Sequence, residues 1–431
     1  MSVKAEWHRL REAVVHRPGI EMFFGLLEPS SFLYDRFFSM DEAVFEHKGL
    51  EHTLSKIGVE VKRLKSLFID ALRKKESARA QVAKKVSTLI KYVGFSAESA
   101  KKSFLEALDS MDPETLFNLL LLNPTVETRA RKSEEGKRVI YPFVKLGVPL
   151  ANLYYLRDQQ AATDIGMVYG RMAKPQRRRE VFITKVTFEA SGHKTAWSVR
   201  APGTFEGGDF MPAGDFALIG EGDRTNLNGI LQVMRHGVGY EEIAVVHYPS
   251  HPLIAGDGHE PMLFMHLDTY FNFAGEGLAV GCGTLLDHTL VDVYHKKRNG
   301  KYEKEESGVK LYTYIRNKGF DIIRLTNFEQ LALAPNFLTV DDRKIVAVDV
   351  ERNIDATLKK IERLRAQNPE KFSAFCDHAL REYQELKLTR EFFPRKKALE
   401  EQRVEAIPLD LYALTGGYGG ARCMVASIRR D

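Results

Sequence analysis

Five short segments of the 431-residue chain place ionisable side chains beside glycines or inside apolar runs, where burial of such groups is costly unless they have partners. They are NLYYLRD (152–158), FEGGDF (205–210), GDRTN (222–226), MHLDTYF (265–271) and GGYGGARC (416–423). Cys423 follows four glycines, which let a backbone approach a ligand closely and adopt positive φ angles. We therefore expect an exposed thiol on a flexible loop, available as a nucleophile. The alternative is a buried cysteine that acts only as a small apolar group.

The acidic and imidazole groups of these segments are spaced to act together. His266 and Asp268 are two residues apart, so in a β-strand both side chains would point into one cavity. Glu206 and Asp209 flank two glycines, a pattern typical of a turn that directs a carboxylate into a site. Asp158 ends a third segment. Each group also has a structural explanation: a satisfied His–Asp pair, a turn closed by its own aspartate, or a local ion pair.

One thiol, one imidazole and three carboxylates make chemical sense as a set. Carboxylates around a cysteine raise the thiol pKa and suppress the thiolate, so they would hinder a cysteine hydrolase of neutral substrates. A planar cation reverses this effect, because carboxylates bind a guanidinium through paired, charge-assisted hydrogen bonds and the bound cation then favours the thiolate. The sequence therefore predicts covalent chemistry on a guanidine, with Cys423 as the nucleophile.

The elements that must position these residues follow an α/β pattern. Strand, helix and strand recur over 10–64, 216–247, 310–325 and 337–367. Short β runs are separated by Gly, Pro and Asp turns, and they include VFITKVTF, FALIG, IAVVHY and LFMHL. From about residue 66 to 124 the chain is rich in Lys, Glu, Ala and Leu, with apolar residues at helical spacing. We interpret this stretch as an inserted set of helices, the alternative being a helical layer that covers the main sheets.

The composition disfavours several other functions. The net charge of +5 is a small difference between 63 basic and 58 acidic residues, and basic clusters such as 177–179 are typical of solvated faces, so no nucleic-acid partner is expected. Three cysteines without CxxC spacing indicate neither a disulfide framework nor a zinc site. The apolar runs are too short to cross a membrane, and the first residues lack the apolar core of a signal peptide. We expect a cytoplasmic protein without a metal or other cofactor.

In their order along the chain, these motifs resemble the arginine deiminases of the guanidine-modifying, or pentein, superfamily. The resemblance covers nearly the whole chain and is carried by VVHRPG near the start, the stretch around Glu51–Val61, NLYYLRD, FEGGDF, MHLDTYF and the terminal GGxGGxRCM. It implies an α/β fold, a five-bladed α/β propeller of ββαβ units with an inserted α-helical domain. The implied pentein catalytic domain covers 1–65 and 139–431, and the helical insertion domain covers 66–138.

The resemblance also implies a reaction and a role for each residue. Arginine and water would give citrulline and ammonia through a covalent thiouronium intermediate on Cys423. His266 would act as general acid and then as general base, and Glu206 would orient it. The implied substrate-binding residues are Asp158 and Asp268 for the guanidinium, and Asn152, Arg171 and Arg224 for the α-carboxylate and amine. No cofactor is implied, the partner is a small guanidino compound, and a homo-oligomer is compatible with this function.

Three positions depart from the usual pattern of the family. Gln159 replaces a proline, Tyr270 replaces a valine, and Tyr418 stands near the place of an arginine that usually precedes the cysteine loop. These differences concern the far end of the substrate.

Two other functions stay open: an amidinotransferase, in which an amine resolves the Cys-bound amidine, and a non-catalytic pentein that binds a partner. The charged pocket argues against the second, because its desolvation would be costly without a function.

Overall fold

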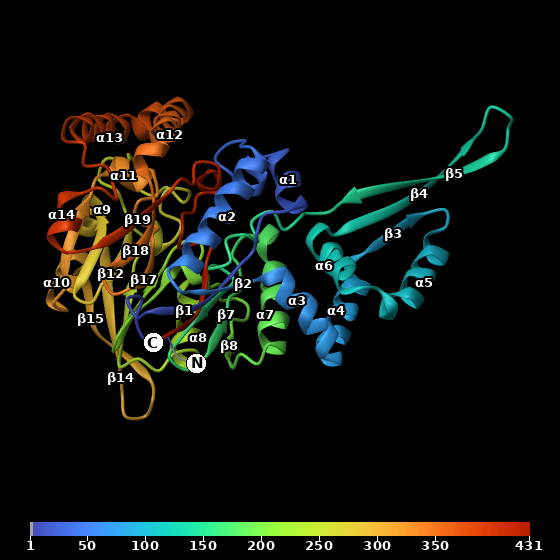
Figure 1. Ribbon diagram of the computed structural model, residues 1–431, viewed down its shortest axis with the longest axis horizontal. Helices are drawn as coiled ribbons and strands as arrows, with labels where there is room; N and C mark the ends of the chain where they lie inside the picture. Colours follow the sequence, from blue (N-terminus) through green and yellow to red (C-terminus); the bar gives the residue numbers. More distant parts are fainter. Residues whose placement is uncertain (1–2) are drawn as a thin grey trace.

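The computed structural model describes residues 3–431 and contains six sheets with covering helices (Figure 1). The strands are β1 (Leu10–Val15), β2 (Glu60–Arg63), β3 (Lys91–Gly94), β4 (Pro124–Lys132), β5 (Arg138–Leu146), β6 (Gln160–Ala162), β7 (Met167–Tyr169), β8 (Thr195–Ser198), β9 (Phe210–Ala213), β10 (Phe216–Gly220), β11 (Glu242–Val246), β12 (Phe271–Gly275), β13 (Leu278–Cys282), β14 (Leu290–Lys296), β15 (Tyr302–Lys310), β16 (Asp321–Leu325), β17 (Leu338–Asp341), β18 (Lys344–Val348), β19 (Glu405–Leu409) and β20 (Ala426–Arg430). The α-helices are α1 (Ile20–Leu26), α2 (Met40–Lys56), α3 (Leu64–Lys74), α4 (Glu76–Leu89), α5 (Ala97–Ala107), α6 (Pro113–Leu122), α7 (Glu180–Ala190), α8 (Leu227–His236), α9 (Gly283–His288), α10 (Leu311–Asn317), α11 (Asn327–Leu331), α12 (Ile354–Gln367), α13 (Pro369–Thr389) and α14 (Lys397–Glu401).

In five of the sheets, the central strand has an antiparallel neighbour on one side and, on the other, a parallel neighbour that comes later in the chain; in β3-β4-β5 the parallel neighbour β3 comes first. The five triplets are β20-β1-β2, β6-β7-β8, β9-β10-β11, β12-β13-β16 and β17-β18-β19. A parallel pair needs a crossover connection, and helices supply it. The helices α2, α7 and α8, for example, connect β1 to β2, β7 to β8 and β10 to β11. The predicted α/β class is therefore confirmed.

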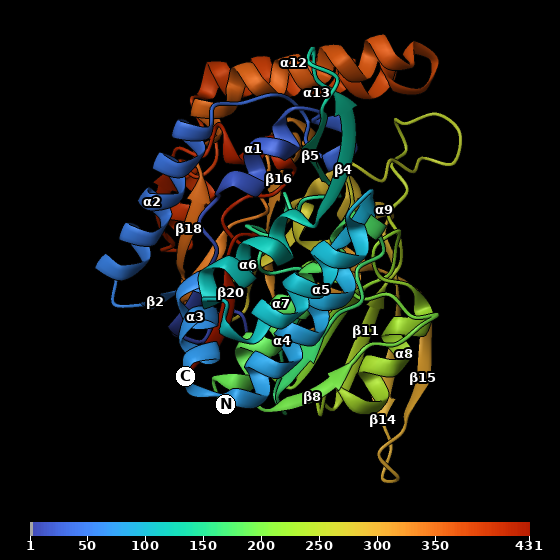
Figure 2. The same cartoon turned by 90° about the vertical axis from the view of Figure 1, so that its right-hand side faces the viewer.

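The first triplet joins the two ends of the described chain. β20 lies antiparallel to β1, and the backbones of Arg9 and Asp431 exchange hydrogen bonds of 2.9 and 3.1 Å. β1 lies between β20 and β2 in this sheet, and Figure 2 shows β20 above the C-terminal end of the chain. Because Cys423 stands just before β20, this pairing anchors the loop that carries the thiol.

No helix within residues 3–431 combines the length and the apolar character that a bilayer crossing requires.

The region from α3 to β5 forms a lateral extension beside the five triplets (Figure 1). α3, α4 and α6 pack against α7 through buried apolar side chains such as Phe68, Phe117 and Ile183. Sequence analysis predicts helices here, over 66–138, but it does not anticipate the sheet β3-β4-β5. β5 pairs with β4 along its whole length, from Arg138 to Leu146. The β4–β5 hairpin projects away from the rest of the molecule (Figure 1).

VFITKVTF, which was predicted as a β run, lies within helix α7. Its β-branched and aromatic residues favour a strand locally. In the helix, however, Ile183, Val186 and Phe188 are buried, and α7 contacts α3 and α4. Burial of a large apolar side chain contributes roughly 1.5–3 kcal/mol, which exceeds the few tenths of a kcal/mol that separate most helix propensities. The prediction was wrong because packing outweighs the local preference.

Candidate active site

Cys423 ends a tightly packed loop, and its side chain is only 4% exposed. A Cβ atom at Gly416 would lie 2.6 Å from the ring of Phe38, and one at Gly419 would lie 2.5 Å from the ring of Tyr155. The glycines are therefore required because aromatic side chains leave no room for a Cβ atom. The prediction that they leave the thiol exposed on a flexible loop was wrong.

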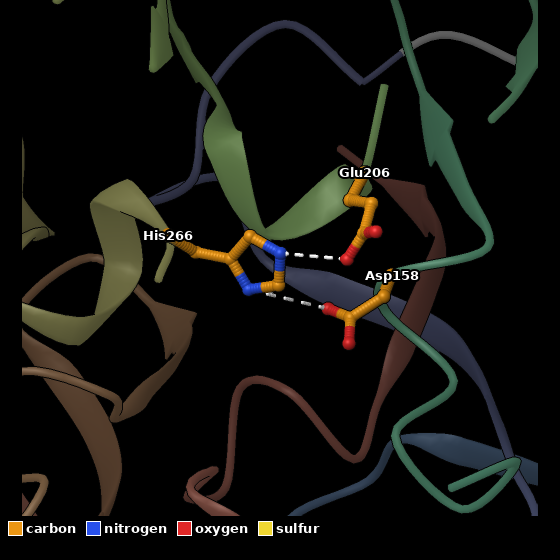
Figure 3. Close-up of side chains that lie close together, drawn as sticks. All are labelled: Asp158, Glu206 and His266. Carbon is orange, nitrogen blue, oxygen red and sulfur yellow. Dashed lines mark hydrogen bonds and ion pairs between the residues drawn. The ribbon is translucent and has the colours of Figure 1, made fainter. Parts of the chain in front are cut away.

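Each ring nitrogen of His266 faces a carboxylate, one nitrogen facing Glu206 and the other Asp158 (Figure 3). Its Nε2 is 2.9 Å from an oxygen of Glu206, and its Nδ1 is 3.9 Å from an oxygen of Asp158. All three side chains are buried. Burial by itself lowers the pKa of the imidazole, but Asp158, Asp209 and Glu206 together raise that pKa to about 9. The ring is therefore protonated at neutral pH and can donate a proton.

The two acids of FEGGDF have opposite pKa shifts. Burial favours a neutral Glu206, yet the hydrogen bond from His266 and the charge of Arg224 outweigh it and lower the pKa of Glu206 to about 2. Burial dominates at Asp209 and raises its pKa to about 7. Asp209 accepts a 2.9 Å hydrogen bond from the backbone N–H of Leu267. Glu206 is thus the ionised partner of the imidazolium, whereas Asp209 holds the turn that follows His266.

MHLDTYF forms a turn rather than the predicted strand. His266 precedes a 3-10 turn over Leu267–Thr269, and the strand β12 begins only at Phe271. The two side chains consequently have different partners: His266 contacts Glu206, and the carboxylate oxygens of Asp268 lie 3.7 and 4.0 Å from Sγ of Cys423. A turn can therefore bring both groups into one centre although they do not share the face of a strand.

Both candidate guanidinium-binding carboxylates have an arginine partner inside the protein. Asp158 accepts a 2.7 Å hydrogen bond from Arg177, and Asp268 accepts one of 2.7 Å from Arg422. Oδ1 of Asp158 has no hydrogen-bond partner among the described residues, and neither has Nδ1 of His266. The arginines therefore orient the two carboxylates, and Oδ1 of Asp158 is available to accept an N–H group of a bound cation.

A buried carboxylate behind the cysteine loop fixes Arg422. Glu6 accepts a 2.8 Å hydrogen bond from Arg422 and forms ion pairs with Arg157 and Arg430. Burial by itself would raise the pKa of Glu6, but the three arginines lower it. Arg157 thus pairs with Glu6 and not with its neighbour Asp158, the local ion pair that sequence reasoning left open.

The charges of the centre oppose ionisation of the cysteine. Burial raises the pKa of the Cys423 thiol well above its usual value, and Asp268 and Asp158 raise it further. A hydrogen bond from Asn336 and the charge of Arg422 act in the opposite direction. The thiol is therefore protonated in this state, and a cation bound between the carboxylates would favour the thiolate.

The three residues predicted to bind the α-carboxylate and amine have different surroundings. Arg224 is 1% exposed, and its Nε and Nη1 have no hydrogen-bond partner within residues 3–431. Arg171 donates to the carbonyl oxygen of Gly203 at 3.3 Å, and Asn152 donates to that of Phe32 at 2.7 Å. Arg224 therefore keeps free hydrogen-bonding capacity, whereas the other two already have protein partners.

Asp158, Glu206 and His266 also have a spacing that resembles a metal site. One potential ligand atom of each lies within 4.8 Å of the other two. A ligand imidazole must be neutral, however, and a pKa of about 9 keeps this ring protonated at neutral pH. The arrangement therefore suits a proton donor between carboxylates better than a metal ion.

Four buried residues of the centre were not predicted from the sequence, namely Glu6, Arg177, Asn336 and Arg422. Arg422 had a signal, because it directly precedes the cysteine. Arg177 belongs to the basic cluster 177–179, which sequence analysis assigns to a solvated face, but its side chain is only 4% exposed. Glu6 and Asn336 lie outside every predicted motif, and only the fold brings them to the centre.

Solved structures identify the class of fold. DDAH from Pseudomonas aeruginosa, in a complex with citrulline, gives a TM-score of 0.50 at 15% identity and covers 97% of this chain and 99% of that one. A variant of AgrE in a complex with L-arginine gives a TM-score of 0.50 at 12% identity and covers 98% of this chain and 40% of that one. The chain therefore has the α/β fold of the penteins.

Sequence comparisons then identify the family. The profile of the arginine deiminase family matches residues 30–430. Arginine deiminase from Halobacterium salinarum is 28% identical over an alignment of 425 residues that covers 83% of this chain and 87% of that protein. Arginine deiminase from Limosilactobacillus reuteri is 26% identical over 384 residues, with 81% and 90% covered. This chain belongs to the arginine deiminase family, which confirms the resemblance in the motifs.

Proposed function

We propose that the chain hydrolyses the guanidinium group of L-arginine to citrulline and ammonia. The observation that carries the proposal is the position of Sγ of Cys423, 3.7 Å from the carboxylate of Asp268, in the same buried centre as the His266–Glu206 pair. Membership of the family and the citrulline and L-arginine bound to proteins of the same fold support this substrate. A guanidinium between Asp158 and Asp268 would supply the positive charge that the thiol needs to ionise.

In the first half of the reaction, the Cys423 thiol loses its proton to solvent once the guanidinium is bound, and the thiolate attacks the guanidinium carbon and forms a C–S bond. The imidazolium of His266 gives its proton to the departing nitrogen as the C–N bond breaks, and ammonia leaves. The charge is then on a thiouronium attached to Cys423, and the imidazole is neutral. Ionised Glu206 beside the ring stabilises the imidazolium before this step.

In the second half, water attacks the thiouronium carbon, and the neutral imidazole of His266 takes one of its protons. The C–S bond breaks, the thiolate leaves with the electron pair, and the protonated urea group loses its hydroxyl proton to solvent. Citrulline is released, and both Cys423 and His266 return to their starting states. One arginine and one water thus give one citrulline and one ammonium ion. Arg224, with Asn152 and Arg171, would bind the α-carboxylate and amine.

The finer architecture that we propose is a five-bladed propeller with an insertion. Five triplets of one strand pattern support five blades, and the pairing of β20 with β1 would close the ring. The pentein catalytic domain would then comprise 1–65 and 139–431. The helical insertion domain would comprise 66–138, which is supported by the helices α4 to α6 and the strands β3 and β4 within these bounds; β5, the partner of β4, lies almost wholly beyond them.

A product analysis tests the proposed function. Wild type and Cys423→Ser are incubated with arginine, agmatine or an arginine-containing peptide, with and without glycine, and the products are identified by mass spectrometry. We expect citrulline and ammonia from wild type, and less than about one tenth of that rate from the variant, since an alcohol is a poor nucleophile here. Formation of guanidinoacetate with glycine would indicate an amidinotransferase, and no turnover of any guanidine would indicate a non-catalytic protein.

A further inference from the structure

Asn336 contacts the predicted nucleophile directly, although no predicted motif contains it. It lies between α11 and β17, and its side chain is fully buried. Its Nδ2 donates to Sγ of Cys423 at 3.2 Å and to the carbonyl oxygen of Asp268 at 3.1 Å. Its Oδ1 accepts the backbone N–H groups of Gly420 at 2.8 Å and of Cys423 at 3.1 Å. The amide thus uses both of its donors and both lone pairs of its oxygen.

The partners fix which end of the amide faces the sulfur. Backbone N–H groups can only donate, so the two from Gly420 and Cys423 must face the oxygen of Asn336. A rotated amide would place donors against donors there, and it would place an oxygen against the carbonyl of Asp268. The NH2 group consequently faces Sγ, where it stabilises a thiolate more than a thiol.

We propose that Asn336 is the neutral hydrogen-bond donor that stabilises the Cys423 thiolate and holds its sulfur in the reactive position. The proposal rests on the proposed function, in which Cys423 is the nucleophile. Asn336 also holds the cysteine loop by hydrogen bonds at three residues. Its side-chain oxygen accepts the N–H groups of Gly420 and Cys423, and its backbone carbonyl oxygen accepts that of Arg422 at 3.1 Å. A Cβ atom at Gly420 would lie 2.8 Å from that carbonyl oxygen, so this close approach requires glycine.

The substrate explains why the donor should be an amide. A lysine or arginine at this place would stabilise the thiolate more strongly, but its charge would repel the guanidinium. The charge of Arg422, the nearest cation of the loop, is shared by Asp268 and Glu6. An amide donates without adding a charge, so it supports the anion and does not compete with a bound cation for the two carboxylates.

Two substitutions and one matched control test the proposal. Asn336→Ala removes the donor to sulfur without adding a charge. Asn336→Asp also removes this donor and keeps the oxygens that accept the loop N–H groups, but its negative charge raises the thiol pKa as well, so the shift in Asn336→Ala decides. Asn272→Ala is the control, because Asn272 is also buried and donates to the carbonyl oxygens of Pro335 and Phe337, on either side of Asn336, without contact to Cys423. Asn272→Ala loosens the segment that carries Asn336 and leaves the donor to Sγ in place, whereas the substitutions at Asn336 remove that donor.

The decisive measurement is the pH dependence of Cys423 alkylation by iodoacetamide, followed by peptide mass spectrometry without substrate. We expect either Asn336 variant to shift this profile to higher pH and to lower the labelling rate at pH 8 on the order of tenfold, with a similar loss in kcat and a smaller change in KM. Asn272→Ala should keep the wild-type profile. A wild-type profile in the Asn336 variants, or an equal shift in all variants, would overturn the proposal. Because the readout is the thiol itself, it is independent of the Cys423→Ser turnover assay on which the proposed function depends.

Discussion

His266 and His251 are both buried, but their surroundings shift their pKa values in opposite directions. Burial dominates at His251 and lowers its pKa to about 4, while three carboxylates raise that of His266 to about 9. We expect an NMR titration of labelled histidines to show a charged His266 and a neutral His251 at pH 7. The pKa of His266 in the folded protein lies above its ordinary value of 6.5. The charged ring therefore stabilises the fold fully below pH 6.5, and this stabilisation is lost as the pH rises through 9. A neutral His266 at pH 7 would contradict its role as the proton donor.

Arg224 is the residue at which recognition of the far end of the substrate can be tested. Its Nε and Nη1 are buried and lack partners among the described residues, so a substrate carboxylate would satisfy them. We expect agmatine, which has no carboxylate, to have a kcat/KM on the order of tenfold to a hundredfold below that of arginine. Arg224→Ala should narrow this difference, as steady-state kinetics with both substrates would show. Equal rates for arginine and agmatine in wild type would contradict the binding of the substrate carboxylate by Arg224, but they would not affect the proposed Cys–His chemistry.

The residues that we propose to react stand in motifs that the sequence indicates, but their partners in the structure could not be predicted. Cys423, His266 and Glu206 stand in short motifs whose composition indicates their chemistry. Glu6 and Asn336 have ordinary neighbours in the chain, and they reach the centre only because strands far apart in sequence come together. A single sequence shows local pattern, whereas the pairing of a buried charge depends on the fold.

At the scale of elements, the glycines of the cysteine loop differ from Gly49 of helix α2 in what surrounds them. A Cβ atom at Gly419 would lie 2.5 Å from the ring of Tyr155 and 2.9 Å from Cβ of Cys423, whereas nothing lies within 4 Å of one at Gly49 in α2. We expect Gly419→Ala to displace the loop and to lower kcat at least tenfold, because small displacements of reacting groups are costly. Gly49→Ala should retain full activity.

The same pair of variants has a thermodynamic readout. Alanine in the interior of α2 should stabilise the protein by about 0.5–1 kcal/mol, so Gly49→Ala should raise the midpoint of urea unfolding. Gly419→Ala should lower it, since the loop must move away from Tyr155. Wild-type activity in Gly419→Ala would show that the loop tolerates a side chain and that its packing does not position the thiol.

The elements were predictable where local pattern and packing agree. The first strand, α2 and β2 fall within the segments that the sequence indicates. α7 and the turn after His266 do not, because burial and side-chain hydrogen bonds decide their conformation. β4 is a mainly polar strand within the stretch predicted to be helical, whereas β5 is largely apolar. Both strands are mostly exposed or half-buried, so pairing along their length rather than a buried face defines the hairpin.

At the scale of the whole molecule, the projecting hairpin should be separable from catalysis. Arg129 pairs with Tyr141 in the β4–β5 ladder, and the residues beyond this pair are mostly exposed. Replacing residues 130–140 with Asn-Gly, a sequence suited to a two-residue hairpin turn, should leave kcat/KM within about twofold of wild type. Steady-state kinetics and light scattering would measure activity and mass together. A large loss of activity would show that the hairpin contributes to the site, directly or through assembly.

The pairing of β20 with β1 has a consequence for the order in which the protein becomes active during synthesis. A nascent chain presents β1 early, but the partner of β1 and the thiol of Cys423 both emerge at the far end of the described sequence. Until then one edge of β1 is unpaired, and the centre lacks the cysteine that we propose as its nucleophile. Contacts between residues so distant in sequence, such as Arg9 and Asp431, form slowly. Activity should therefore appear only after the last strand is made, and never on a partly translated chain.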